Sequence, residues 1–558
     1  MSTGPDTYGR PGDPIGPDVL GSPEPPRRSR RRTAIIGAGV VTSLAVAGGA
    51  FAAYSFLGGG GTQPEDALPG GAVAYFEVDL DPGAGQKVNA LRLAQKFPDS
   101  GVKGEGSLKD DLLRRAFEEE GSKIDYDRDV KPWLGDRIGF VALDELDEDG
   151  DPLVAAALQV KDRDDAQAGL DRLIEAERAS AEDGRDPESE PLSGYAFGAE
   201  GYVILAETME IAQRVVDDAE QGTLADDPTY SRALEELGGD RVATAWVDVG
   251  RAVELLPVEQ REALLVFEAP DAVVTGSYVL GLSVGSDAVE LEGKAVDLDL
   301  GGLGYSEVIG SEPGQLLGQM PPDALSAGSA TGLGQGLTDV FGQLEEAGLL
   351  DEDGLGFVRE QAAGMGIELP ADIMAVLGDE TAYAVLPAEG EPLLAGRTRG
   401  GDPARAIEVI NRVYEAGQDT ADEPFTDTTY CGTLTPEERD LLGSCENRLA
   451  PVPGPEPAPP IDLTGLLREY DGGLVVSSDP EATTAMAGDG RLRDEERFRR
   501  AMPDAVAPFA VYVDLARIFE TYPEEIGLTE TAVANVQPLE AIGISATATS
   551  FQVRLTLR

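Results

Sequence analysis

The chain contains no histidine, and this limits the chemistry that its side chains can perform. Catalytic Ser-His-Asp and Cys-His sets and histidine-ligated metal centres all need that residue, so these classes of site are excluded. The segment from Gly281 to Gly285 matches the G-x-S-x-G pattern around Ser283. A nucleophile elbow requires a strand that turns into a helix, whereas a second strand-like segment follows Gly285. We therefore interpret the match as structural.

Two other segments have the residue types of a binding loop without the required spacing. Acidic residues cluster over 144–151, but with Gly150 at position six of a calcium loop, position twelve is Ala156 and not glutamate. The glycine turn over 81–87 lacks the Gly-Lys-Ser/Thr ending of a phosphate loop. We expect a solvated hairpin turn at the first segment and a helix start at the second. The sequence thus predicts no catalytic residue, no metal site and no cofactor.

An uncharged segment over 33–57 follows a cluster of five arginines between positions 27 and 32. At about 1.5 Å per residue, the segment is long enough to cross the roughly 30 Å hydrocarbon core of a bilayer. By the positive-inside rule, residues 1–32 form a disordered cytoplasmic tail, 33–57 a transmembrane helix in contact with lipid, and the remainder is exported. The predicted localisation is the cell membrane, with a single span and an extracytoplasmic C-terminus.

Two alternatives to a permanent anchor stay open. The small residues Ala50 and Ala52 have the spacing of a signal-peptidase site, and Arg30 to Arg32 allow a twin-arginine signal. In each reading the chain after position 57 is still exported. Residues 58–67, which begin with four glycines, are expected to form a flexible linker.

The formal net charge is −59, from 103 acidic and 44 basic residues. Nucleic-acid binding needs basic side chains that displace counterions, so this composition predicts no nucleic-acid partner. A high net charge keeps an exported protein soluble. The charge alone therefore identifies no partner, and we expect an envelope partner of unknown type.

Four patterns recur in the same order about 240 to 270 residues apart, which indicates an internal duplication. The pairs are 130–143 with 370–386, 152–176 with 392–416, 244–257 with 509–523, and 278–295 with 539–558. We predict ectodomain repeat 1 over residues 68–310 and repeat 2 over 311–558.

Within each repeat, the local patterns switch between strand and helix. Short apolar runs at 138–143 and 153–160 flank a polar turn, which predicts a hairpin. Aspartate before proline at 227–228, 402–403 and 479–480 predicts three capped helix starts. In the predicted strands, apolar and polar residues alternate, and long continuous apolar runs are missing. This favours an α+β fold, a tandem duplication of antiparallel or mixed sheets covered by helices on one face.

The segment LPGGAVAYFEVDLDPGAGQKVNALRLAQKFP, from Leu68 to Pro98, resembles the opening of the DUF3352 family of bacterial proteins. The segment WVDVGRAVELL and the late strands are similar to the same family, so the resemblance covers nearly all of the exported part. It implies one N-terminal anchoring helix. The family has no established activity that could be carried over to particular residues.

Taken together, these patterns predict a single-pass membrane-anchored protein with a non-catalytic binding or scaffolding role at the cell envelope. The alternative is a histidine-independent hydrolase that uses paired carboxylates or a divalent cation. With 103 acidic residues, the sequence offers too many carboxylate pairs to select one. We expect any binding groove to lie between the two repeats.

The predicted topology can be tested with protease added to intact cells from which the wall has been removed. Everything after Leu57 should be digested and the N-terminal tail should survive, because only the tail lies in the cytoplasm. An ectodomain protected from external protease would contradict this topology.

Cys431 and Cys445, the only cysteines, both fall in an insertion that repeat 1 lacks, and we predict a disulfide between them. Two unpaired thiols are the alternative. Denatured, unreduced protein should give almost no thiol labelling and should label only after reduction. Full labelling without reductant would refute the bridge. Cys431→Ser should loosen the insertion and leave repeat 1 folded.

Overall fold

The computed structural model describes most of the chain from residue 62 onward. The parts after residue 61 that it leaves out are 81–83, 99–109, 111–112, 115–124, 148–149, 183–193, 199–200, 259–260, 262–272, 300–309, 347–355, 422–462, 464, 489, 524–525 and 528–529. The predicted tail (1–32), the predicted span (33–57), Cys431 and Cys445 all lie outside the described residues. Among the helices that are described, none is long and apolar enough to cross a bilayer.

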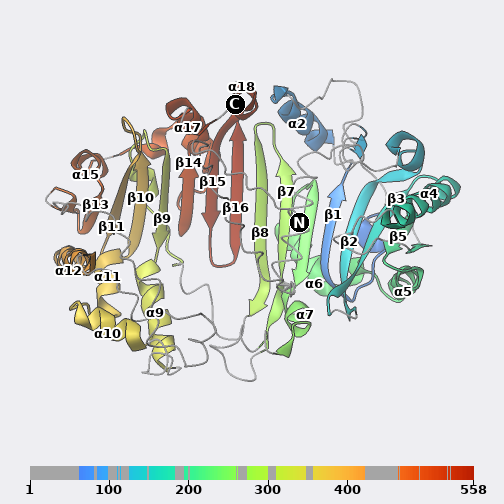
Figure 1. Ribbon diagram of the computed structural model, residues 1–558, viewed down its shortest axis with the longest axis horizontal. Helices are drawn as coiled ribbons and strands as arrows, with labels where there is room; N and C mark the ends of the chain where they lie inside the picture. Colours follow the sequence, from blue (N-terminus) through green and yellow to red (C-terminus); the bar gives the residue numbers. More distant parts are fainter. Residues whose placement is uncertain are drawn as a thin grey trace, which may run out of the picture. The chain divides into compact units, whose positions relative to one another are not determined.

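The described strands form one antiparallel sheet of sixteen strands (Figure 1). Their order across the sheet is β12-β13-β11-β10-β9-β14-β15-β16-β8-β7-β6-β1-β2-β3-β5-β4. The strands are β1 (Ala72–Asp79), β2 (Leu134–Leu146), β3 (Pro152–Val160), β4 (Gly194–Phe197), β5 (Tyr202–Ala206), β6 (Ala243–Asp248), β7 (Thr275–Val284), β8 (Ala288–Asp299), β9 (Ser326–Thr331), β10 (Glu380–Leu386), β11 (Leu393–Arg399), β12 (Leu467–Tyr470), β13 (Gly473–Ser477), β14 (Phe509–Val513), β15 (Leu539–Ala546) and β16 (Ser550–Leu557).

Helices lie in the longer connections between these strands, whereas neighbouring strands such as β7 and β8 are joined by turns. The described α-helices are α2 (Ala84–Gln95), α4 (Arg163–Glu182), α5 (Met209–Ala219), α6 (Pro228–Leu237), α7 (Val249–Glu254), α9 (Leu333–Glu346), α10 (Gly356–Gly364), α11 (Ala371–Leu377), α12 (Pro403–Ala421), α15 (Pro480–Met486), α16 (Glu496–Ala501), α17 (Leu515–Thr521) and α18 (Glu530–Val536). The three predicted starts are confirmed. The carboxylates of Asp227, Asp402 and Asp479 each accept a hydrogen bond from a backbone N–H in the first turn of the helix that follows.

Strands β1 to β8 occupy one half of the sheet and β9 to β16 the other. From the centre outward, the first half reads β8-β7-β6-β1-β2-β3-β5-β4 and the second reads β16-β15-β14-β9-β10-β11-β13-β12. Each strand of the first half thus has a counterpart eight strands later, at the same distance from the centre. The two halves are joined edge to edge in one sheet.

Helices cover both faces of the sheet, so the expectation of helices on one face is wrong. Adjacent residues of a strand point to opposite faces. Tyr75 of β1 packs in a core with residues of α5 and α6, whereas its neighbour Phe76 packs in another core with residues of α4. The reason is visible in β1, where Ala72 to Phe76 are all buried, as in a strand that is covered on both sides.

The central pairing of β8 with β16, here called the seam, joins the two halves. Its register runs from Ser550 opposite Lys294 to Thr556 opposite Ala288, with Leu291 facing Val553 in the middle. The side chains of Arg554 and Glu290, which lie directly opposite each other in this ladder, form an ion pair. A cross-strand pair of opposite charge favours this register over a shifted one.

Each half fastens the start of its first strand with the same arrangement of aspartate and arginine. In the first half, Asp248 accepts from the backbone N–H of Arg251 (3.0 Å), and the Arg251 guanidinium donates to the carbonyls of Gly70 (3.1 Å) and Ala72 (3.0 Å). In the second half, Asp514 and Arg517 repeat this arrangement, and Arg517 donates to two carbonyls just before β9. The sequence pattern Val-Asp-x-x-Arg is therefore a structural clamp.

A buried aspartate also recurs in both halves. Asp129 accepts from the backbone N–H of Asp125 (3.1 Å) and from the Arg172 guanidinium (2.8 Å). Asp372 accepts from the backbone N–H of Glu368 (2.7 Å) and from the Arg405 guanidinium (2.7 Å).

 Hydrogen bonds from Arg128 hold the pKa of Asp129 well below its usual range, and those from Arg405 lower the pKa of Asp372. Both carboxylates are therefore ionised at neutral pH and tie a turn to the helix that follows.

Asp129→Asn and Asp372→Asn should each lower the free energy of unfolding by about 2 kcal/mol at pH 7, because a buried carboxylate loses its charged hydrogen bonds. A lowered pKa stabilises the fold above the ordinary aspartate pKa of about 3.9, and that stability is lost as the pH falls below it. The difference in free energy of unfolding between each variant and the wild type should therefore become smaller below about pH 4. Urea denaturation at several pH values measures both effects. The matched control is Asp127→Asn, whose exposed carboxylate should matter little.

The stretch expected to be a linker differs from that expectation at its end. Residues Pro64–Asp66 form a 3-10 turn, and Glu65 and Ala67 are buried. Burial of an apolar residue and of a carboxyl group ties this stretch to the sheet. Gly58 to Gly61 lie outside the described residues.

Candidate functional site

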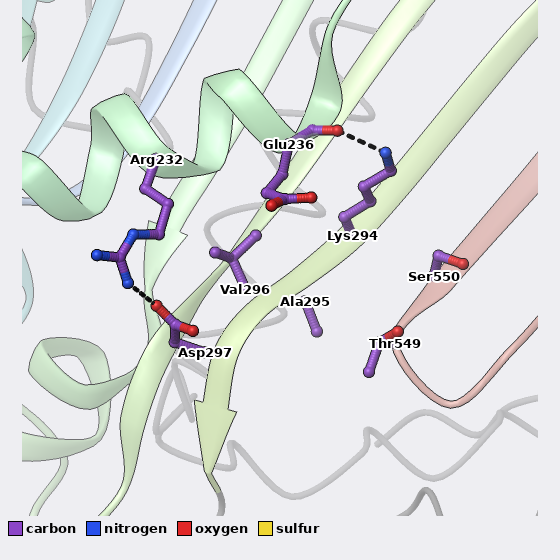
Figure 2. A pocket seen from close by; sticks show the side chains of 8 residues that line it. All are labelled: Arg232, Glu236, Lys294, Ala295, Val296, Asp297, Thr549 and Ser550. Carbon is purple, nitrogen blue, oxygen red and sulfur yellow. Dashed lines mark hydrogen bonds and ion pairs between the residues drawn. The ribbon is translucent and has the colours of Figure 1, made fainter.

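A pocket of about 340 Å³ lies at one end of the seam. Figure 2 shows its lining, which comes from α6, from β8 and from the turn that leads into β16. The lining residues are Arg232, Glu236, Lys294, Ala295, Val296, Asp297, Thr549 and Ser550. Because α6 and β8 belong to the first half and the turn belongs to the second, both halves contribute to the pocket.

The side chains of Arg232, Lys294 and Asp297 in the pocket are paired with groups of the first half. Arg232 of α6 forms an ion pair with Asp297 of β8 (Figure 2). The Lys294 ammonium donates to the backbone carbonyl of Glu236 (2.5 Å) and lies 3.3 Å from a carboxylate oxygen of Glu292. The side chains of Arg232 and Asp297 are 62% and 65% exposed, so their ion pair contributes little stability and can exchange partners.

Local backbone geometry places these groups around the pocket. Asp227 caps the start of α6, which sets the direction in which Arg232 and Glu236 leave the helix. Asp297 has a φ of 49°, in the left-handed region, where the pairing of β7 with β8 shifts register. Such an irregularity bends a strand and changes the direction of its side chains. It brings Asp297 within reach of Arg232.

The opposite end of the seam has the corresponding elements but is closed by an ion pair. There, Arg500 of α16 reaches across the seam and contacts Asp287, in the turn between β7 and β8, at 2.9 Å. The backbone contact beside it occurs at both ends: Leu557 N–H donates to Asp287 O, and Ala295 N–H donates to Thr549 O, each at 2.8 Å. Thr549 thus occupies the position that Asp287 occupies at the other end.

Further polar contacts fill the closed end. Arg500 also contacts Glu540 at 2.8 Å and donates to the backbone carbonyl of Leu557 at 3.0 Å. The Lys96 ammonium donates to the same carbonyl at 3.3 Å. Burial lowers the pKa of Lys96, and the nearby Arg500 acts in the same direction. The two ends of the seam therefore share a backbone frame and differ in their side chains.

The segments singled out in the sequence do not meet at the pocket. Ser283 lies in β7, and the chain continues into β8, so the strand-to-helix turn of a nucleophile elbow is not formed there. Asp147 accepts from the backbone N–H of Asp151 (2.8 Å) within the turn of the β2–β3 hairpin. Gln86, in the first turns of α2, donates to Asp240 O and accepts from Val284 N–H, each at 2.8 Å. All three segments serve the fold.

Sequence reasoning missed the residues that line the pocket. A signal was present in the sequence, because Asp287 and Thr549 follow the same pattern of residues in the two halves. Asp287 is acidic and Thr549 is neutral, so the two halves differ in charge at this position. Among the described residues, no group of three or more acidic or cysteine side chains is placed to hold a metal ion.

The comparisons with known proteins identify a family and little else. No curated protein matches the chain. Two solved structures, crystal forms III and I of TP0453, are similar to 46% and 45% of this chain and to 89% and 88% of their own, at 12% and 10% identity. Their TM-scores of 0.21 and 0.18 are too low to support a conclusion. The family model described as "Protein of unknown function (DUF3352)" matches residues 34–403, well over half of the chain, and the protein therefore belongs to the DUF3352 family.

Proposed function

We propose that this protein is a membrane-anchored, extracytoplasmic binding or scaffolding protein of the cell envelope, and that the pocket at the seam is its binding site. The uncharged segment at 33–57 would be the anchor. Residues 68–310 and 311–558 would be the two copies of a duplicated unit. The matching strand orders of the two halves support this division.

One observation carries the choice of site. Arg500 closes one end of the seam through Asp287. At the other end, Thr549 occupies the position of Asp287, and Arg232, the corresponding arginine of α6, pairs with Asp297 instead. A threonine hydroxyl cannot neutralise a guanidinium, so the arginine turns away and leaves space. The backbone at the two ends of the seam is alike, but only this end is open. A pocket suits ligand binding because it offers a ligand more contact area than a flat surface does.

The lining of the pocket supports binding over the hydrolase alternative. A carboxylate mechanism needs two acidic groups with separate roles beside the substrate. The acidic side chains of the pocket are Glu236 and Asp297, and Arg232 neutralises Asp297. The pocket is lined by basic, acidic and hydroxyl side chains. This lining suits the binding of a partner with both charged and neutral polar groups better than it suits carboxylate catalysis. Binding is therefore our first proposal.

Thr549→Asp should close the pocket and abolish partner binding, because it gives Arg232 a carboxylate where Asp287 serves Arg500. We would place a photo-reactive amino acid at Glu236 and irradiate native membranes. The unsubstituted background should give a discrete adduct, and Thr549→Asp should lower its yield at least tenfold.

The matched control carries the same photo-reactive residue at Glu235. Consecutive helix residues point about 100° apart, and Glu235 is exposed but does not line the pocket. An adduct should form from Glu236 and not from Glu235. Equal adducts from both positions, no adduct from Glu236, or an adduct that survives Thr549→Asp would each contradict the proposed site.

A further inference from the structure

Residues 62–70, here called the docking segment, are bound firmly to the first half of the sheet. The carbonyl of Thr62 accepts from the guanidinium of Arg137 (3.0 Å) and from the hydroxyl of Tyr202 (2.8 Å). Leu68 is fully buried, and its carbonyl accepts from the backbone N–H of Leu224 (2.8 Å). The segment is the first part of the chain described after the predicted membrane span.

The middle of the docking segment carries a carboxyl group into the core. Glu65 is 9% exposed, and the hydroxyl of Tyr75 lies 3.0 Å from its carboxyl oxygen. The same hydroxyl lies 3.0 Å from a carboxyl oxygen of Glu77. Pro64 packs directly over Gly139, where an added Cβ would stand 2.5 Å from the Pro64 ring, so this close approach needs glycine.

Two carboxyl groups therefore share one phenol, and this arrangement favours the binding of an additional proton. A phenol has a single proton and can donate it to one carboxylate only. The second contact at 3.0 Å becomes a hydrogen bond when the other carboxyl is protonated and donates to the phenol oxygen. If both carboxyls were ionised, two like charges would stand on either side of one hydroxyl in a desolvated place.

We propose that the docking segment is a proton-controlled latch, which is held while Glu65 and Glu77 share a proton across Tyr75 and is released when both carboxyls are ionised. The latch would couple the pH outside the membrane to the way the sheet is held next to the anchor. That consequence rests on the proposed anchoring. The latch itself does not.

Burial is the main factor that favours retention of the proton. Burial, and then the charge of Glu77, raise the pKa of Glu65 to about 7, and burial raises the pKa of Glu77. Burial also raises the pKa of Tyr75 and of Tyr230 well above the usual range, so both phenols stay neutral. The other charged or titratable groups that face the pair are Asp66 on the same segment, Asp79 on β1, Arg137 on β2, Tyr202 on β5 and Arg241 just before β6.

The direction of the pH effect follows from these shifts. The pKa of Glu65 is about 7 when docked and near its ordinary value of 4.5 when released. The docked form thus binds the proton more tightly, and docking is strongest below about pH 4.5. It weakens as the pH rises from about 4.5 to about 7 and stays weak above that range.

The second half provides an internal comparison without a shared proton. There, the chain before β9 is held by Glu380, which accepts from the backbone N–H groups of Gln315 (2.6 Å) and Leu316 (2.7 Å) and pairs with Arg399 at 2.8 Å. These donors are amide and guanidinium groups, and no second carboxyl shares them through a phenol. The chain before β9 is therefore the control for the latch.

Hydrogen exchange of the full-length chain, measured from pH 5 to pH 8.5, tests the latch. After correction for intrinsic exchange rates, the protection of amides in residues 62–70 should fall by about 100-fold as the pH rises from 5 to 8. Amides of residues 314–326 should show no such fall. In Glu65→Gln, whose carboxamide can accept from Tyr75 without ionising, protection at pH 8 should remain within about threefold of its value at pH 5.

Glu77→Gln is the second variant, because removal of either charge removes the need for the shared proton. It should also flatten the pH dependence, and it decides the question if Glu65→Gln does not fold. A wild-type docking segment whose protection varies no more than that of residues 314–326 would overturn the proposal. So would a folded Glu65→Gln or Glu77→Gln variant that keeps the wild-type pH dependence. These results do not depend on whether the pocket at the seam binds a partner.

Discussion

The seam between β8 and β16 is the contact on which the rest of the architecture depends. Because the two strands are antiparallel and Leu291 faces Val553 at its centre, a local two-fold axis runs through the ladder and relates one half to the other. Each strand at a given distance from the seam then has an equivalent on the opposite side, and so do several side-chain arrangements. The clamps of Arg251 and Arg517 and the buried carboxylates of Asp129 and Asp372 illustrate this rule.

Against that repeated frame, the differences between the halves locate the candidate sites. The aromatic contact between Tyr230 and Trp246 corresponds to that between Phe498 and Tyr512, with ring centroids 5.5 and 5.1 Å apart. The carboxyl pair of Glu65 and Glu77 is held in the first half, whereas the second half uses Glu380 with amide and guanidinium partners. The packing and the two clamps are thus the same in both halves, while the polar groups that hold the chain before β1 and before β9 differ.

Much of the fold could be predicted from local sequence, because caps and hairpins depend on neighbouring residues. Asp402 before Pro403 predicted a helix start, and the acidic turn after Leu143 predicted a hairpin; both are confirmed. The seam could not be predicted, since it pairs strands more than 250 residues apart and the alternation of Val289 and Leu291 says nothing about which strand lies alongside. The pocket depends on the same long-range pairing. Glu65 looked like part of a polar linker because its burial is set by Tyr75 and Gly139, which lie elsewhere in the sequence.

The position of β16 at the end of the sequence affects the order in which the strands of the sheet can pair during folding. β8 can pair with β16, its neighbour across the seam, only after residues 550–557 have been made, although β7, its neighbour in the same half, is finished long before. During that interval β8 is an open sheet edge, which is a template for pairing with any other extended chain. A contact so distant in sequence also forms slowly, because closing a long loop costs entropy before the contact is gained. A chain that crosses a membrane while it folds would therefore expose this edge for most of its transit.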